Sequence, residues 1–193
     1  MIQKFDFQKT KLSGAYLIKA FKAIDYRGCF IKDFNIETFR KNGIEHELKE
    51  VFYTTSKKGV IRAIHFQIIK QQAKLVRCIK GHVFDVIVDL RKESPTFGEW
   101  LGFDLTEENA YCLYIPEFFG HGYLVIEDSI VSYQCNEVFF GEYDSGIIYD
   151  DATIGIEWPF EKIGGKNELI ISEKDLHLET FKDYNMEPIA KLQ

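Results

Sequence analysis

The region from residue 50 to residue 138 is a succession of short apolar or alternating segments separated by turn-forming residues. Such segments recur at roughly the 8–12-residue spacing that is typical of antiparallel sandwiches and barrels. The expected strands are 51–55, 60–66, 74–79, 81–90, 100–105, 111–115, 123–126 and 130–138. No alternation of strands with long helical segments is visible. We therefore predict a mainly β fold, a jelly-roll β-barrel with a few short helices, whose inward polar residues mark the mouth of a cavity.

The flanking regions carry weaker signals. Residues 15–21 are apolar and predict an initial strand, and residues 25–28 predict a turn. A short helix is expected over residues 36–41, because Asn42 and Gly43 form a stop signal. After about residue 165 a glycine-rich loop leads into a helical or loose tail. Since the 193 residues contain no internal repeat and no linker, we expect a single domain over residues 1–193.

Charge and composition exclude several classes of protein. A formal net charge of -6 argues against binding to a nucleic-acid backbone, so an anionic ligand needs a local cationic pocket. No segment has the length of a membrane span and the N-terminus has no apolar leader, so no membrane partner is expected. The four cysteines have no paired spacing, which predicts reduced, buried thiols in a cytoplasmic protein.

One expected strand, residues 60–67, carries polar groups that a plain core strand would not contain. Arg62, His65 and Gln67 interrupt its apolar residues, which indicates that the strand lines a pocket. Lys74 begins the next strand, and a glutamine-rich turn places it beside His65. An imidazole next to an ammonium is typical of a base beside a group that stabilises negative charge.

His65 has two other interpretations. A lone histidine in a strand is often a hydrogen-bonded core residue. A metal site is the other alternative, but the chain contains no His-x-His pair, and its ligands would have to come from His65, His82 and His121 without a recognisable spacing. His121 lies between two glycines after a proline-marked turn, where the backbone can approach a ligand closely.

Two further residues depend on where the fold places them. Tyr133 is ordinary strand filler unless its phenol faces the same cavity as His65, where it would donate a proton. Asp175 follows Ser172 at the start of an expected helix, as a capping pattern does. It also has the chemistry of a carboxylate that orients a histidine base.

Six segments together resemble the dTDP-4-dehydrorhamnose 3,5-epimerase family of cupin-fold enzymes, in order and with few gaps from about Arg27 to Asp175. They are GVIRAIHFQ (59–67), QAKLVR (72–77), GHVFDVIVD (81–89), SPTFG (94–98), IPEFFGHG (115–122) and DDATIGIEWP (150–159). The resemblance implies epimerisation at C3 and/or C5 of a nucleotide-diphosphate-linked 4-keto-6-deoxy sugar, without metal or other cofactor, in the biosynthesis of a surface polysaccharide. It also implies a homodimer that exchanges N-terminal strands.

The resemblance assigns roles by position. His65 matches the base, Asp175 its partner, Tyr133 the acid, and Lys74 the cation beside the enolate oxygen. The positions that match substrate-binding residues are Arg62, Gln67, His121, Asp144, Lys174 and, reaching in from the neighbouring subunit, Arg27.

Four positions differ from the usual family residues. The family usually has glutamate at Lys32, glutamine at Glu50, asparagine at Phe52 and glutamate at Asp144. All four surround the nucleotide and the sugar in the family, and a site that pairs with particular donors rejects a ligand that lacks them. We therefore expect a GDP-linked 4-keto-heptose or 6-deoxyhexose to be as good a candidate as a thymidine sugar. The alternatives are an epimerase of C3 only and a sugar-nucleotide-binding cupin without turnover.

Overall fold

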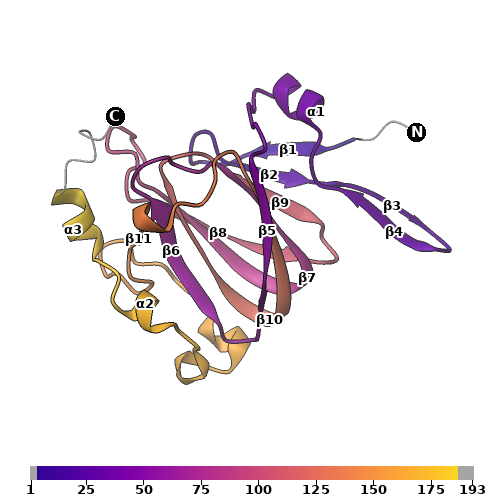
Figure 1. The fold of residues 1–193 in the computed structure, drawn as a ribbon. Coiled ribbons are helices and arrows are strands. Elements are labelled where there is room, and N and C mark those ends of the chain that lie inside the picture. The colour runs from indigo at the N-terminus through magenta and orange to yellow at the C-terminus, as the bar shows by residue number, and fades with distance from the viewer. Residues whose placement is uncertain (1–3, 187–193) are drawn as a thin grey trace.

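Two long antiparallel strands, β7 (Lys74–Asp89) and β10 (Phe119–Cys135), lie side by side and connect the two halves of the β-structure (Figure 1). They belong to a computed structural model that describes residues 4–186. On its other edge, each long strand pairs with one strand along its first part and with a different strand along its second part. The first part of β7 pairs with β9 (Tyr111–Ile115) and its second part with β8 (Trp100–Thr106). The first part of β10 pairs with β6 (Ile61–Gln67) and its last part with β5 (Glu50–Ser56). The result is the jelly-roll barrel predicted from the sequence.

The long strands differ from the prediction, which divided each of them into two. The residues between the expected segments form bulges, because the register of β10 on β7 shifts between Val125 and Val131 without a chain reversal. Gly81 makes the bend possible. Its φ is 79°, and a Cβ there would lie 2.2 Å from the carbonyl oxygen of Asp128. A bulge increases local twist, so one strand can serve both sheets.

The N-terminal elements extend the sheet and then leave it. β1 (Asp6–Lys9) pairs with β2 (Tyr16–Lys19), which pairs with β9. The single strand expected over residues 15–21 is instead divided between β2 and β3 (Phe21–Asp25). β3 and β4 (Gly28–Lys32) form a separate two-stranded hairpin that projects away from the barrel (Figure 1). The expected turn at residues 25–28 connects them.

Short helices complete the chain. α1 (Ile36–Lys41) has the predicted bounds, and the Asn35 side chain accepts a hydrogen bond from the backbone N–H of Thr38 at its start. The remaining elements are η1 (Gly141–Tyr143), β11 (Asp144–Gly146), η2 (Phe160–Ile163), η3 (Lys166–Glu168), α2 (Glu173–Leu176) and α3 (Phe181–Met186). The predicted tail thus contains two short helices, and its last residues, 187–193, lie outside the described part.

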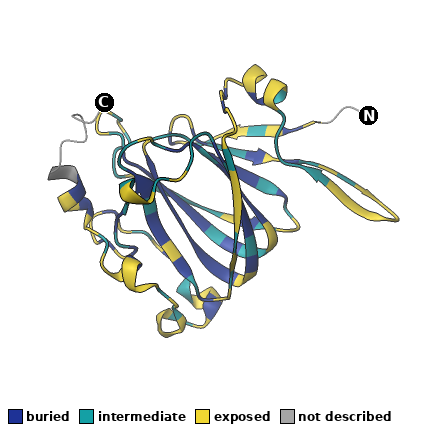
Figure 2. Cartoon of the chain, viewed as in Figure 1, coloured by how far each residue is buried: buried dark blue, intermediate teal, exposed yellow. Residues whose placement is uncertain are grey.

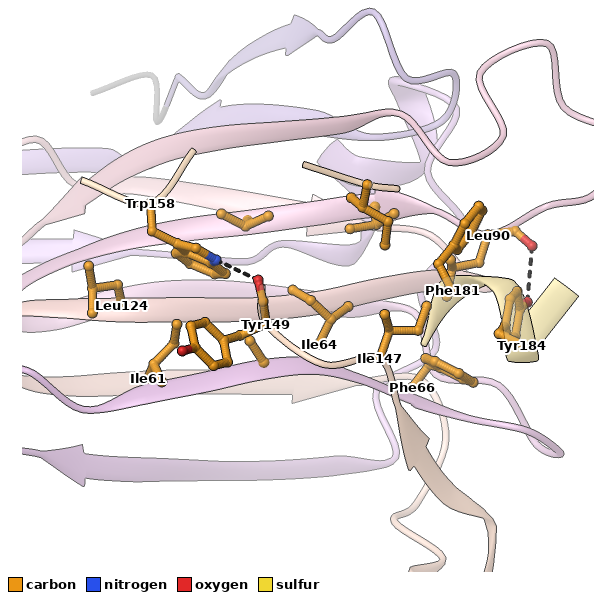
Figure 3. Close-up of a cluster of buried hydrophobic side chains, with 14 of the residues drawn as sticks. Ile61, Ile64, Phe66, Leu90, Leu124, Ile147, Tyr149, Trp158, Phe181 and Tyr184 are labelled. Atoms are coloured by element: carbon orange, nitrogen blue, oxygen red, sulfur yellow. Dashed lines mark hydrogen bonds between the residues drawn. The ribbon is translucent and has the colours of Figure 1, made fainter. Parts of the chain in front are cut away.

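The C-terminal segment is held against the barrel by a hydrophobic cluster (Figure 3). Trp158 donates a hydrogen bond from Nε1 to the carbonyl oxygen of Tyr149 at 2.8 Å, and the Tyr184 hydroxyl donates to the carbonyl oxygen of Leu90 at 3.1 Å. Burial of each large side chain stabilises the docked segment by about 2–3 kcal/mol. Figure 2 shows the buried residues concentrated on the barrel strands, whereas the β3–β4 hairpin is mostly exposed. This docking carries α2 to the edge of β6.

The cysteines follow the prediction in part. Cys78, Cys112 and Cys135 are buried and unpaired, but Cys29 is exposed in the β3–β4 hairpin, which corrects the expectation of four buried thiols. Its position in a hairpin outside the barrel is the reason. Within residues 4–186, none of the helices has the length and apolarity needed to cross a membrane.

Candidate active site

A cavity of about 580 Å³ opens between β5, β6, β10 and the segment that leads into α2. The fold brings most of the predicted site residues into its walls. Those that line it are Phe52, Arg62, His65, Gln67, Lys74, His121, Tyr133, Asp144, Lys174 and Asp175. Among the described residues, Arg27, Lys32 and Glu50 are the predicted ones that do not line it.

A bulge in β6 places both basic side chains of this strand in the cavity. His65 pairs with His121 of β10, and Arg62 pairs with Tyr123. The first pair and the second are three residues apart on β6 but only two residues apart on β10, so β6 carries one extra residue. Residues an odd number of positions apart normally face opposite sides of a strand. The extra residue changes this, so Arg62 and His65 face the same side. Gly122 accommodates the bulge, because a Cβ there would lie 2.6 Å from the carbonyl oxygen of Arg62. The glycine after His121 thus makes room for a neighbouring strand.

His65 is held by a carboxylate from the C-terminal segment. Its Nε2 lies 3.3 Å from Oδ1 of Asp175, which is buried. The backbone N–H of Asp175 donates to the Ser172 hydroxyl at 3.1 Å. Burial alone would raise the pKa of the Asp175 carboxyl, but the interactions with His65, with the Ser172 hydroxyl and with the Ala63 backbone together outweigh it, and the pKa lies below its usual value. The carboxylate is therefore ionised at neutral pH and can stabilise an imidazolium.

A second carboxylate approaches the other ring nitrogen. Asp144 places Oδ1 4.0 Å from Nδ1 of His65, and its other oxygen accepts a hydrogen bond from the Lys174 ammonium. Lys174 thus contacts an acidic neighbour of the base. The imidazole lies between two carboxylates, with a quarter of its side chain exposed to the cavity.

Tyr133 and Lys74 supply a phenol and a cation from the deep side of the cavity. The Tyr133 ring stacks on Phe52 with centroids 4.6 Å apart. Burial raises the pKa of the Tyr133 phenol well above its ordinary value, and the nearby Tyr123 adds to the shift, so the group keeps its proton at neutral pH. Burial also lowers the pKa of the Lys74 ammonium. Both groups are thereby prepared to exchange or stabilise charge inside the cavity.

A buried acid that was not predicted from the sequence lies behind His121. Asp85 is fully buried on β7, and both of its oxygens lie 3.0 Å from Nε2 of His121. Burial raises the pKa of Asp85, an effect that the nearby imidazole opposes. Asp85 lies on the same face of β7 as Val83 and Ile87, and both of these belong to the inner core. An acidic residue at an inward position of an apolar strand was the signal available in the sequence.

Other predicted residues have different surroundings. The Gln67 amide donates to the carbonyl oxygen of Lys70 at 2.7 Å and accepts from the backbone N–H of Phe140 at 2.6 Å, so it fixes a loop at the cavity wall. Glu50 accepts a hydrogen bond at 3.0 Å from the backbone N–H of Phe139, which lines the cavity. Both side chains therefore shape the wall through the backbone.

The two remaining residues lie on the projecting hairpin. Arg27 is in the turn between β3 and β4 and pairs with Asp25 at 2.6 Å, and Lys32 ends β4. The resemblance predicted Arg27 in the site of a neighbouring subunit and Lys32 beside the nucleotide and the sugar, and both remain predictions.

The histidines of the metal alternative are not assembled at one place. His65 and His121 line the cavity, but His82 lies outside its walls and contacts Asp104 at 2.6 Å. In the part of the chain that the structure describes, no group of three or more His, Cys, Asp or Glu side chains is arranged to hold a metal ion.

Comparisons with known proteins agree with this geometry. The family model described as dTDP-4-dehydrorhamnose 3,5-epimerase matches residues 9–183. A dTDP-4-dehydrorhamnose 3,5-epimerase from Methanothermobacter thermautotrophicus is 49% identical over 173 residues, which cover 89% of this chain and 92% of the relative.

Solved structures give the same family. A 3,5-epimerase from Legionella pneumophila, crystallised with dTDP-4-keto-L-rhamnose, superimposes with a TM-score of 0.87 at 31% identity, over 93% of this chain and 94% of the other. An epimerase from Mycobacterium tuberculosis gives a TM-score of 0.88 at 32% identity, over 93% and 90% of the two chains.

Proposed function

The chain belongs to the dTDP-4-dehydrorhamnose 3,5-epimerase family and is an isomerase of sugar nucleotides, and from this we propose its substrate and mechanism. The substrate is a dTDP-linked 4-keto-6-deoxy sugar, which the enzyme epimerises at C3 and C5 during the biosynthesis of a surface polysaccharide. The observation that carries the proposal is the His65–Asp175 pair in the same cavity as a buried, protonated phenol, that of Tyr133.

The mechanism assigns one step to each group. The 4-keto group acidifies the hydrogens on C3 and C5. His65 removes one of them, while Asp175 stabilises the imidazolium that forms. The electron pair moves to the keto oxygen, where the Lys74 ammonium stabilises the enolate. Tyr133 then delivers its proton to the opposite face of the carbon. Each inversion leaves His65 with one extra proton and Tyr133 with one fewer.

The remaining cavity residues position the substrate. Arg62 is exposed on β6 with its Nε 3.2 Å from the Ser56 hydroxyl, so its guanidinium is available to a phosphate. His121, oriented by Asp85, faces the same space. We assign both to the diphosphate and the sugar. Since the net charge is -6, the Arg62 guanidinium supplies local positive charge that the overall composition does not.

We favour thymidine over guanosine as the base. The expectation of a GDP-linked heptose or hexose rested on Lys32, Glu50, Phe52 and Asp144. Glu50 lies outside the cavity walls and holds the backbone of Phe139, and Asp144 keeps a carboxylate. The relatives at 49% and 31% identity carry thymidine nucleotides in their names. Epimerisation of C3 alone has less support, because those names include both carbons.

The test is deuterium incorporation. The protein is incubated in deuterium oxide with dTDP- and GDP-linked 4-keto-6-deoxy sugars, and mass spectrometry counts the deuterons gained. Two deuterons in the dTDP sugar support the proposal. One deuteron would identify a C3-only enzyme, and faster labelling of the GDP sugar would replace the nucleotide assignment. Binding without any labelling would favour the cupin that binds sugar nucleotides without turnover.

We also propose that the enzyme is a cytoplasmic homodimer that exchanges its N-terminal strands. The β3–β4 hairpin projects from the barrel and exposes Ile24, Tyr26 and Phe30, with 72%, 96% and 55% of their surfaces accessible. Exposed apolar groups on a protruding hairpin are typical of an interface, and Arg27 in its turn would then reach a neighbouring site. Sedimentation equilibrium tests this, and a monomer at micromolar concentration would refute it.

A further inference from the structure

The imidazole of His65 has two ring nitrogens, and each of them faces a carboxylate. Nε2 lies 3.3 Å from Oδ1 of Asp175, within hydrogen-bond distance, and Nδ1 lies 4.0 Å from Oδ1 of Asp144, beyond it. A neutral imidazole carries one proton, so one nitrogen donates and the other accepts. The two carboxylates therefore compete for a single proton, and a neutral His65 can donate to only one of them.

The position of this proton decides whether His65 can act as a base. If the proposed function holds, His65 takes a proton from the sugar with a nitrogen that has a free lone pair. Because Nε2 faces Asp175, Nδ1 is the nitrogen that remains for the sugar. A proton on Nε2 leaves Nδ1 free, whereas a proton on Nδ1 turns the base into a donor. Protonation of both nitrogens, which two unneutralised carboxylates favour, has the same effect.

Lys174 makes the two carboxylates unequal. Its ammonium donates a hydrogen bond to Oδ2 of Asp144. Among the described residues, the ion pairs join Asp144 to Lys174 as well as to His65, whereas they join Asp175 to His65 alone. The side chain of Asp144 is only 14% exposed, so solvent screens its charge weakly and the neighbouring cation matters. Asp175 is therefore the stronger acceptor for the imidazole proton.

We propose that Lys174 is a positioning residue that sets the tautomer of His65 by neutralising Asp144. The imidazole proton then stays on Nε2, against Asp175, and Nδ1 is free to take the proton of the sugar. Lys174 and Asp175 are adjacent on α2, and the Ser172 hydroxyl at the start of this helix holds the backbone N–H of Asp175 at 3.1 Å. One turn of helix thus supplies both the acid that receives the imidazole proton and the cation that offsets the competing acid.

NMR of nitrogen-15-labelled histidine tests the tautomer directly, because protonated and unprotonated ring nitrogens have well-separated chemical shifts. The signals of His65 are those that disappear in His65→Asn. At neutral pH we expect the proton on Nε2 in wild type and on Nδ1 in Lys174→Met, whereas Lys174→Arg keeps the charge and the wild-type pattern. Lys166→Met is the matched control. The Lys166 side chain is also 55% exposed and pairs with Asp150 at 3.1 Å, but it does not line the cavity.

Steady-state kinetics separate this role from the substrate-binding role that the resemblance gives Lys174. Lys174→Met should lower kcat by at least about tenfold, the order by which a hydrogen bond to a charged group shifts an equilibrium. In an Asp144→Asn background the same substitution should cause no further fall, because an amide has a donor and an acceptor and suits either tautomer. Loss of a binding contact would instead raise KM at constant kcat, equally in both backgrounds. That result would refute the inference.

The outcomes also separate this inference from the proposed function on which it rests. If wild-type enzyme labels no 4-keto sugar in deuterium oxide, the proposed function fails, whereas the NMR result still decides the tautomer. A proton on Nδ1 of His65 in wild type refutes the role of Lys174, and so does a Lys174→Met variant with the wild-type tautomer and kcat. If Lys174→Met does not fold, Lys174→Gln removes the charge with a polar side chain, and both measurements are repeated on it.

Discussion

Nε2 of His65 lies 3.3 Å from Oδ1 of Asp175, although one residue belongs to a barrel strand and the other to a short helix near the C-terminus. The contact depends on the cluster around Trp158 and Phe181 that docks the C-terminal segment. Docking of the C-terminal segment on the barrel is therefore what places the carboxylate beside the base.

The first prediction concerns this pair. His65→Asn should lower kcat/KM for epimerisation by roughly 10²–10⁴, the usual contribution of a general base. Asp175→Asn should lower it by tenfold or more, because the imidazolium loses its counter-charge. Steady-state kinetics with the dTDP sugar measure both. Unchanged turnover in His65→Asn, with folding confirmed by circular dichroism, would remove His65 from the mechanism.

The second prediction separates the base from the acid. In Tyr133→Phe, His65 can still remove a proton and return a deuteron to the same face. We expect deuterium exchange with retention of configuration, while inverted product falls by roughly 10²–10⁴. Proton NMR of the sugar ring distinguishes the two results. Inversion at the wild-type rate would show that another group delivers the proton.

The third prediction concerns the alkaline limb of the pH profile. Burial lowers the pKa of Lys74, so this ammonium loses its charge at a lower pH than an exposed lysine. Catalysis needs the cation, and kcat/KM should therefore fall as the pH rises through this lowered pKa. Lys74→Arg keeps a charge to above about pH 12, so its residual activity should lack this fall. If kcat/KM falls at the same alkaline pH in wild type and in Lys74→Arg, the fall belongs to a different group.

The fourth prediction concerns stability at low pH. Asp89 is fully buried at the end of β7 and accepts hydrogen bonds from Arg91, Ser94 and Thr96. Burial would raise the pKa of Asp89, but these bonds outweigh it and lower the pKa to about 2. The unfolded chain binds the proton near pH 3.8, so the stabilisation is complete above that pH and is lost as the pH falls toward 2.

The corresponding experiment is chemical denaturation as a function of pH. Asp89→Asn should reduce the free energy of unfolding at neutral pH by at least about 2 kcal/mol. The difference from wild type should shrink between pH 4 and pH 2. The exposed Asp6→Asn variant is the control and should follow wild type throughout. A difference that does not change with pH would mean that Asp89 acts through packing and not through its charge.

Much of the barrel follows from local pattern. The helix over residues 36–41 was predictable because Asn35 and Asn42 cap a short amphipathic run, and the strand around His65 was predictable as a pocket wall because polar groups interrupt it. The family resemblance added the pairing of His65 with Asp175, which no local signal contains.

Long-range geometry accounts for what the sequence did not reveal. Alternation alone does not tell a bulge from a turn, so β7 and β10 were each divided in two. The contact of the Tyr123 hydroxyl with Thr54 was not predicted, because the two residues lie 69 positions apart in sequence. Lys32 and Glu50 were grouped with the cavity through the resemblance, whereas in this chain they lie outside its walls.

The bulge in β6 lets a strand present two side chains on one face at a spacing that regular alternation forbids. Arg62 and His65 are three positions apart, and only the extra residue brings both into the cavity. Deletion of one residue between them would make the spacing even, so regular alternation could keep the pair on one face without a bulge. The pair of basic groups is therefore compatible with two backbone solutions, a bulged strand of this length and a regular strand one residue shorter.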